Sequence, residues 1–188
     1  MSAELEGIRV AALVEQGFEQ VELTEPAKAL EAAGASVDIV SPREAKVRAW
    51  NHGDWGDEVD VDVQLGAADP NAYDALLLPG GVMNPDRLRQ NPDAWGFVKA
   101  FFAARKPVAA ICHAPWLLID SGVVDNRRMT SYPSLQSDLK NAGANWVDQE
   151  VVVDRGLITS RSPRDIPAFS RAFIAEIMRA NHLMEGDS

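Results

Sequence analysis

Cys112 is the only cysteine of the chain, and its surroundings favour chemistry. It lies in Lys106–Trp116 (KPVAAICHAPW), where a buried apolar strand is expected to turn abruptly into a helix. The free N–H groups at the start of a helix carry partial positive charge, which favours thiolate over thiol. The nucleophile elbow of hydrolases has the same geometry. A lone cysteine can also be a small buried hydrophobe, but its place at a strand end makes Cys112 the leading candidate nucleophile.

His113 is the candidate general base because it follows Cys112 directly. A ring nitrogen within hydrogen-bond reach of the sulfur could take the thiol proton. Neighbouring side chains on a sharp turn can diverge, so the alternative is a solvent-facing residue at the helix N-terminus. The distance between the ring nitrogen and the sulfur decides between them.

Glu19 is the predicted acid, in the segment Gln16–Leu23 that follows the first strand. An ionised carboxylate beside Cys112 would oppose thiolate formation, whereas a protonated one could donate a hydrogen bond to the sulfur. We therefore predict that burial raises the pKa of Glu19, which would let it carry protons for a bound carbonyl compound. The alternative is an ordinary exposed carboxylate in a loop.

A double glycine, Gly80 and Gly81, ends another apolar strand. Glycines there serve a turn with positive φ, and they also let a substrate oxygen approach the backbone. The N–H groups of Gly81 and His113 are therefore the predicted oxyanion hole. Asp86 begins the next helix, where a negative charge is favoured by the helix dipole whether or not it has a catalytic role.

The elements that position these residues alternate between apolar strands and helices. This pattern predicts an α/β fold with a mostly parallel sheet covered on both faces, whose ligand crevice lies at the carboxyl ends of the strands. The expected strands are Ile8–Val14, Ser36–Val40, Tyr73–Leu78 and Lys106–Ile111, and the expected helices are Thr24–Ala33, Asp86–Ala104, Ala114–Ser121 and Ile166–Met178.

Two hairpins complete the predicted sheet. An antiparallel hairpin over Trp50–Leu65 is expected at a sheet edge, and Val151–Asp154 with Leu157–Ser160 is expected to close the other side. Ser162 and Asp165 have the spacing of a helix cap, with Pro163 at the first helical position.

Composition excludes several classes of protein. With 188 residues and 46% hydrophobic content, a single domain over residues 1–188, with its core at about 7–180, is expected. A net charge of −10 disfavours nucleic acid as a partner. No run is apolar enough for a membrane span, and no secretory signal begins the chain, so we expect a cytoplasmic protein. One cysteine forms no internal disulfide, and His52, His113 and His182 lack metal-ligand spacing.

Several segments together resemble the PfpI-type intracellular proteases. The superfamily of these proteases includes the parkinsonism-associated deglycase and cofactor-independent glyoxalases, and its fold is the class I glutamine amidotransferase-like fold. The resemblance covers nearly the whole chain. It rests on GFEQVEL at Gly17–Leu23, LLLPGG at Leu76–Gly81, KPVAAICHAP at Lys106–Pro115, TSYPSLQSDLKNAGANWVD at Thr130–Asp148 and EVVVDRGLITSRSP at Glu150–Pro163.

The resemblance implies a flavodoxin-like three-layer sandwich without metal or organic cofactor. It makes Cys112 the nucleophile, Glu19 its carboxylic-acid partner and His113 the adjacent imidazole. It also implies a homo-oligomer, a dimer or hexamer, in which Asp86 of a neighbouring subunit orients His113. Two positions depart from many relatives: Ala114 stands where glycine is common, and Asp86 is shorter than glutamate.

Three functions are compatible with these residues. The preferred one is a stress-response hydrolase of the glyoxalase or deglycase type, in which Cys112 adds to small reactive carbonyls or their adducts. The second is a cysteine peptidase that uses Cys112, His113 and Asp86 on a peptide after assembly. The third is a redox sensor or holdase whose Cys112 is oxidised under oxidative stress.

Overall fold

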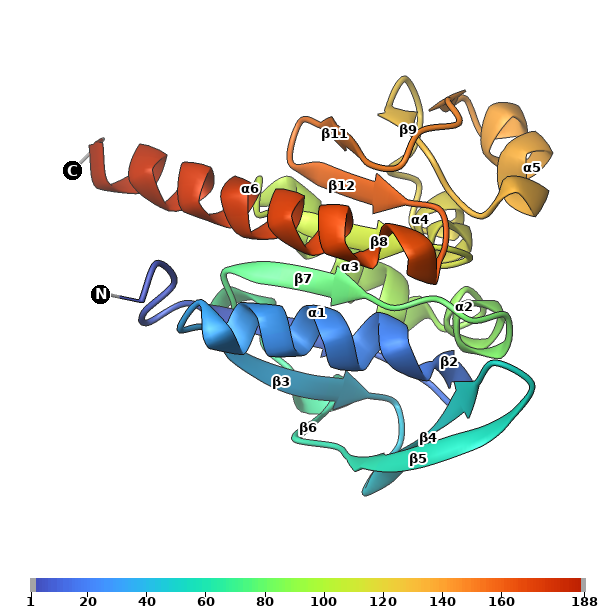
Figure 1. Cartoon of the computed structure of the whole chain (residues 1–188), viewed down its shortest axis with the longest axis horizontal. Helices are drawn as coiled ribbons and strands as arrows, with labels where there is room; N and C mark the ends of the chain where they lie inside the picture. Colours follow the sequence, from blue (N-terminus) through green and yellow to red (C-terminus); the bar gives the residue numbers. More distant parts are fainter. Residues whose placement is uncertain (1–2, 187–188) are drawn as a thin grey trace.

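The computed structural model describes residues 3–186, which build a seven-stranded sheet between two layers of helices (Figure 1). Every neighbouring pair in the sheet is parallel except β11 and β12. The inner strands are buried along their length because helices cover both faces. In spatial order the strands are β11 (Val152–Asp154), β12 (Leu157–Ser160), β8 (Val108–Ile111), β7 (Ala75–Leu78), β1 (Arg9–Leu13), β3 (Ser36–Ser41) and β6 (Val63–Gln64).

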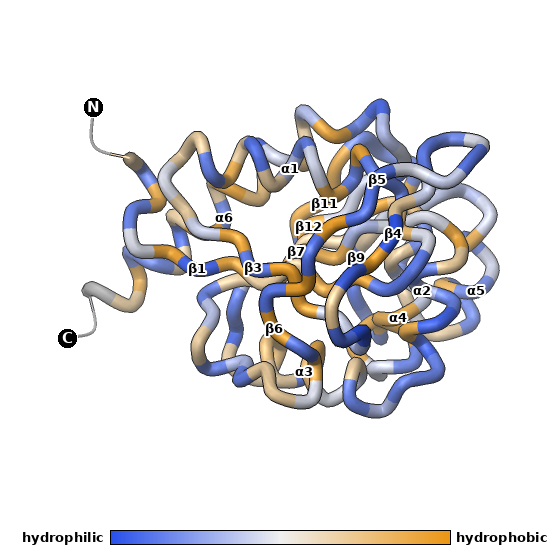
Figure 2. Tube along the Cα trace, turned by 90° about the horizontal axis from the view of Figure 1, so that it is seen from below, coloured by the Kyte–Doolittle hydropathy of each residue, from blue (hydrophilic) through white to orange (hydrophobic). Residues whose placement is uncertain are grey.

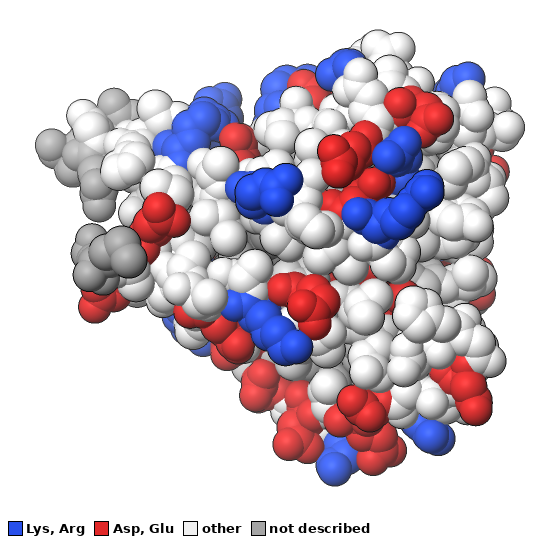
Figure 3. Space-filling model, in the orientation of Figure 1, with Lys and Arg blue, Asp and Glu red and all other residues white. Residues whose placement is uncertain are grey.

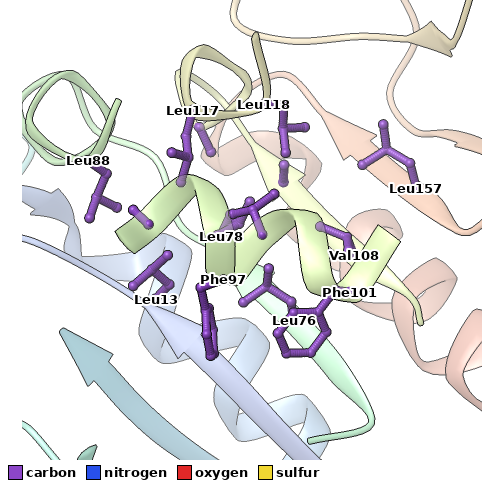
Figure 4. Packing of buried hydrophobic residues seen from close by; sticks show 14 of the residues in the cluster. Leu13, Leu76, Leu78, Leu88, Phe97, Phe101, Val108, Leu117, Leu118 and Leu157 are labelled. Atoms are coloured by element: carbon purple, nitrogen blue, oxygen red, sulfur yellow. The ribbon is translucent and has the colours of Figure 1, made fainter. Parts of the chain in front are cut away.

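Alternate residues of the strands enter two separate cores. On one face, α1 (Gln20–Ala32) and α6 (Ile166–Gly186) pack over the inward side chains of β1, β7 and β8. On the other face, α3 (Pro92–Ala103) and α4 (Pro115–Asp120) do so, together with α2 (Met83–Leu88) and α5 (Gln136–Asn141). Figure 4 shows Phe97 and Phe101 of α3 against Leu76 of β7. Burial of each such side chain contributes about 1.5–3 kcal/mol. The predicted three-layer α/β sandwich is confirmed.

A second, three-stranded sheet lies beside the first helix. Its strands are β2 (Phe18–Glu19), β4 (Lys46–Asn51) and β5 (Asp54–Asp60), and β2 pairs with β4 in parallel. The predicted hairpin at Trp50–Leu65 was therefore misplaced. It begins at Lys46, where Val47 and Ala49 are the buried alternate residues, and Val63–Gln64 instead joins the main sheet as β6.

Several helix boundaries differ from the predicted ones. The first helix begins at Gln20 rather than Thr24, and the last continues through Gly186 rather than ending at Met178. The expected helix over Asp86–Ala104 is two helices, because Asn91 caps α3 with its side chain. Ser162 makes no side-chain cap; instead the Asp165 carboxylate accepts hydrogen bonds from the backbone and side chain of Arg161.

Figure 2 shows the hydrophobic segments concentrated in the central strands and the hydrophilic ones in the outer loops. Within residues 3–186, no helix combines the length and apolar character that crossing a membrane requires.

The remaining short elements are two strands and four 3₁₀ helices. They are β9 (Arg128–Met129) and β10 (Asn145–Trp146), which pair with each other, and the 3₁₀ helices at Leu65–Ala67, Pro70–Ala72, Pro133–Leu135 and Pro163–Asp165.

Candidate active site

Cys112 lies at the predicted turn between β8 and α4. Its φ of +63° is in the left-handed region, which side chains other than glycine rarely adopt. Backbone bonds on both sides hold this conformation: its N–H donates to Ser160 O at 3.1 Å, and its carbonyl accepts from Tyr132 N at 2.9 Å. Such strain is retained at sites where the surrounding structure determines the backbone, and active sites are the usual case. The side chain is 7% exposed, so only a small reactant has access to the sulfur.

The His113 ring lies beside the sulfur. Its Nδ1 is 3.1 Å from Cys112 Sγ, within the reach required of a general base. The ring stacks on Tyr132 with centroids 4.6 Å apart, and Nε2 lies 3.4 Å from Ser134 Oγ. Burial lowers the pKa of His113 to about 4, so the imidazole is neutral at neutral pH and is a weaker base than an exposed histidine.

The carboxyl group beside Cys112 belongs to Glu22, which corrects the prediction for Glu19. Glu22 lies in the first turn of α1 and is fully buried, and its Oε2 accepts a hydrogen bond from Gly80 N–H at 2.8 Å. Burial raises the pKa of Glu22 to about 8, and the Cys112 side chain acts in the opposite direction. The predicted acid with a raised pKa is therefore present, three residues further along the chain.

Glu19 points toward the β4–β5 hairpin. Its Oε1 accepts from His52 N–H at 3.0 Å and lies 3.7 Å from His52 Nδ1. The cause is the pairing of β2 with β4, which holds Glu19 in extended conformation immediately before the helix. Its charge still contributes to the raised pKa of Glu22.

Burial raises the pKa of the Cys112 thiol, and the Glu22 carboxylate raises it further. This direction is opposite to the predicted preference for thiolate. The N–H groups of Gly81 and His113 act against it by hydrogen bonding to the sulfur. At neutral pH Cys112 is therefore a thiol, and burial keeps the proton on Glu22 up to a pKa of about 8.

The double glycine is required by the close approach of three segments. A Cβ on Gly80 would lie 2.6 Å from Ile111 O and 2.8 Å from Cys112 Cβ. Gly81 has a φ of +79°, and a Cβ there would lie 2.6 Å from Gly17 O. With these side chains absent, the N–H groups of Gly81 and His113 both hydrogen-bond to the sulfur. The two donors predicted to form an oxyanion hole therefore lie together, and their catalytic role stays a prediction.

Comparison with known proteins identifies the family. Residues 8–176 match the DJ-1/PfpI family. The chain belongs to this family. It is 43% identical over 163 residues to YraA of Bacillus subtilis, whose name assigns it provisionally to the cysteine proteases (87% of this chain, 94% of YraA). It is 42% identical over 167 residues to a protein of Pyrococcus abyssi named a deglycase (89% of this chain, 98% of the relative).

The solved structure of Drosophila melanogaster DJ-1beta has the same fold as this DJ-1/PfpI chain. The two superpose with a TM-score of 0.83 at 26% identity, over 95% of this chain and 96% of DJ-1beta. The resemblance to the PfpI-type proteins and the flavodoxin-like fold class are thus both confirmed.

Asp86 does not join the site within one copy of this DJ-1/PfpI protein. Its side chain is exposed on α2, and within residues 3–186 its carboxylate makes no hydrogen bond or ion pair with His113. A contribution from a second copy stays a prediction. In the described part of the chain, no three His, Cys, Asp or Glu side chains are arranged to hold a metal ion.

Sequence analysis missed one further residue that supports the site. Asn84 is fully buried, and its amide nitrogen donates to Pro79 O and Gly80 O, while its oxygen accepts from Glu15 N–H at 2.7 Å. It thereby holds the Gly80 loop against the loop after β1. A polar residue three positions after a double glycine was the available signal, although asparagine is ordinary in loops.

The raised pKa of Glu22 predicts a stability that falls with pH. The carboxyl ionises near pH 4.5 in the unfolded chain and near pH 8 in the folded one. Below pH 4.5 both states are protonated, and between these values only the unfolded state loses the proton. The wild type therefore loses stability as the pH rises to about 8, by several kcal/mol.

Glu22→Gln is expected to abolish this loss. Relative to wild type, its free energy of unfolding should increase by several kcal/mol between pH 5 and pH 8.5, measured by urea denaturation at both values. Glu25→Gln, which changes an exposed carboxylate on the same helix, is the matched control and should show little pH-dependent difference. Identical pH dependence in Glu22→Gln and wild type would refute the assignment.

Proposed function

We propose that this protein is a cysteine hydrolase of the glyoxalase or deglycase type, which converts small 2-oxoaldehydes, free or released from their early adducts, to 2-hydroxy acids. The observation that carries the proposal is the buried Glu22 carboxyl beside Cys112, with a pKa raised to about 8. Such a group exchanges protons in both directions near neutral pH, which an isomerisation within the substrate requires. The name of the Pyrococcus abyssi relative is consistent with it.

The first step is addition of the thiol to the aldehyde. The sulfur attacks the aldehyde carbon, a C–S bond forms, and the carbonyl π electrons move to oxygen. The N–H groups of Gly81 and His113, which hydrogen-bond to the sulfur, are the donors proposed to stabilise the negative charge on the oxygen. As the C–S bond forms, the S–H proton becomes acidic, and His113 Nδ1, 3.1 Å from the sulfur, relays it to the oxygen, which yields a hemithioacetal.

The second step moves hydrogen within the substrate. Glu22, as carboxylate, takes the proton from the carbon bonded to sulfur and returns it to the neighbouring ketone carbon, while the hydroxyl proton moves between the two oxygens. The aldehyde carbon is oxidised and the ketone carbon is reduced, so no external oxidant is needed. Water then attacks the resulting thioester, the C–S bond breaks, and the thiol and the hydroxy acid are released.

The accessibility of the site favours this function over peptide cleavage. Cys112 is 7% and His113 8% exposed, which suits a reactant of a few atoms better than an extended peptide. A Cys-His-Asp triad would in addition need Asp86 from another copy, since the single chain does not bring Asp86 to His113.

Product analysis tests the proposal. We would incubate the protein with methylglyoxal in thiol-free buffer containing a metal chelator, and quantify methylglyoxal and lactate over many turnovers. The expected result is one lactate for each methylglyoxal consumed, and no cleavage of a fluorogenic peptide by the same sample. Methylglyoxal loss that stops at one equivalent per protein, or peptide cleavage without lactate, would contradict it.

A further inference from the structure

A cavity of about 810 Å³ lies at the opposite end of the sheet from Cys112. Asp74, Pro107 and Gly156 line it, and these residues directly precede β7, β8 and β12, so the cavity lies at the amino ends of the parallel strands. The C-terminal turns of α6 form another wall. Figure 1 shows these turns extending past the amino ends of the strands, on the left. The volume of the cavity is typical of a pocket for a small organic molecule.

The charge of this cavity is the reverse of the charge of the protein. The chain has 28 acidic and 18 basic residues, yet Asp74 is the one acidic residue among the described residues that line the cavity. Figure 3 shows acidic atoms gathered over the lower part of the molecule and basic atoms at the upper left, near the end of α6. The basic residues that line the cavity are Arg105, Lys106, Arg127, Arg155 and Arg179.

Three of these five cations have no carboxylate partner within residues 3–186. Arg155 pairs with Asp154, and Arg179 pairs with Glu176, whereas Arg105, Lys106 and Arg127 form no ion pair. Lys106 donates to the carbonyls of Pro70 and Tyr73, and Arg127 donates to those of Val123, Asp154 and Arg155. The Arg105 side chain makes no hydrogen bond in the described part of the chain.

Like charges are held together at this wall. Burial and the neighbouring Arg155 both lower the pKa of Arg127, and Asp154 only partly opposes them. The Arg127 guanidinium is fixed over the Phe102 ring, 4.9 Å from its centroid, so it cannot move far from Arg155. A bound anion would relieve this repulsion by satisfying the unused N–H donors of the guanidinium groups.

The rest of the lining is apolar. Ile8, Phe102 and Ile177 form its inner part, and Leu183 and Met184 lie toward the exposed end of α6. Leu183 is 59% and Met184 75% exposed, so two neighbouring large apolar side chains are accessible to a ligand at this wall of the cavity. A charged wall and an apolar wall therefore face one space.

We propose that this cavity binds a small organic anion with an apolar body. Its carboxylate or phosphate head contacts Arg105 and Arg127, and its apolar body lies against Phe102, Ile177 and Leu183. This site is separate from the proposed catalytic function, since it lies at the other end of the strands and uses none of the residues around Cys112.

Binding of decanoate, measured by isothermal titration calorimetry, tests this inference. We expect saturable 1:1 binding that weakens when salt is raised to 0.5 M, because the salt screens the charges. Decyltrimethylammonium, with the same chain and the opposite charge, should bind at least about tenfold more weakly. Decyl phosphate serves to compare head groups, and inorganic phosphate tests the head alone. Whichever of decanoate and decyl phosphate binds more tightly identifies the preferred head group.

Matched variants locate the site. Arg105→Glu should weaken decanoate binding about tenfold or more, while Arg171→Glu makes the same charge change on an exposed part of α6 outside the cavity and should change it less than about twofold. Leu183→Ser should weaken binding, and Val153→Ser, an exposed apolar position on β11, should not.

The outcomes are separable from those of the catalytic proposal. Cys112→Ser should bind decanoate as the wild type does, whatever its activity. Absence of binding at millimolar decanoate, equal binding of the ammonium compound, or equal effects of Arg105→Glu and Arg171→Glu would overturn the inference.

Discussion

Replacing Cys112 with serine is expected to lower the rate of lactate formation from methylglyoxal by about 10³-fold or more, in line with the loss of a covalent nucleophile. A serine hydroxyl is far less acidic than a thiol, and a single neutral imidazole 3.1 Å away does not compensate for that difference. The backbone should be unaffected, since serine has the same Cβ at the φ of +63°. Steady-state lactate production by purified variant and wild type is the measurement.

Chemical modification is the control for this variant. Cys112 is the only thiol of the chain, so alkylation of wild type with excess iodoacetamide should lower activity in proportion to the fraction of protein that intact mass shows to be modified. The melting temperature of Cys112→Ser confirms that it is folded. A variant that retained a tenth or more of the wild-type rate would exclude the thiol as the nucleophile.

Glu22→Gln is expected to lower the rate about 10²- to 10⁴-fold, the usual contribution of a general acid–base group. Glutamine can still accept the hydrogen bond from Gly80 N–H, so the backbone of the site is retained while the proton transfer is lost. Glu19→Gln is the matched control: it removes a carboxylate three residues away that contacts His52 rather than Cys112, and a loss below about tenfold is expected. The measurement is the rate of lactate formation by both variants at the same pH.

The pH profile provides a second measurement on the same pair. The rate of the wild type should change with an apparent pKa near 8, because that is where Glu22 loses its proton, and Glu22→Gln should lack this inflection. If Glu19→Gln lost as much activity as Glu22→Gln, the assignment of the acid to Glu22 would be wrong.

The main features of the fold followed from local patterns. Uninterrupted apolar strands between helices indicated a parallel sheet covered on both faces, and the four predicted inner strands correspond to β1, β3, β7 and β8 of that sheet. The turn at Cys112 followed from an apolar strand pattern that gives way to a helix, and the structure has it between β8 and α4. The paired donors at Gly81 and His113 followed from placing both segments at carboxyl ends of parallel strands.

The boundaries that failed depend on contacts between distant segments. The pairing of Phe18–Glu19 with Ala49–Trp50 ends the first loop early, so the helix begins at Gln20. A helix that began at Thr24 would have left Glu22 in a loop. The sequence therefore offered no reason to choose Glu22 rather than Glu19 as the acid beside Cys112. The protonation of the thiol likewise depends on the burial of Cys112, which local sequence does not determine.

The sequence by itself indicated the family, through the resemblance of several segments to its members. It also determined the sandwich architecture and the position of the thiol and the adjacent imidazole, because those features depend on apolar periodicity and on neighbouring residues. Only the tertiary structure decided which carboxyl group lies against the sulfur and which cations surround the second cavity. The physical reason is that both depend on how distant segments pack. The pairing of β2 with β4, about 30 residues along the chain, orients the first helix, and the end of α6 closes a space at the amino ends of β7, β8 and β12.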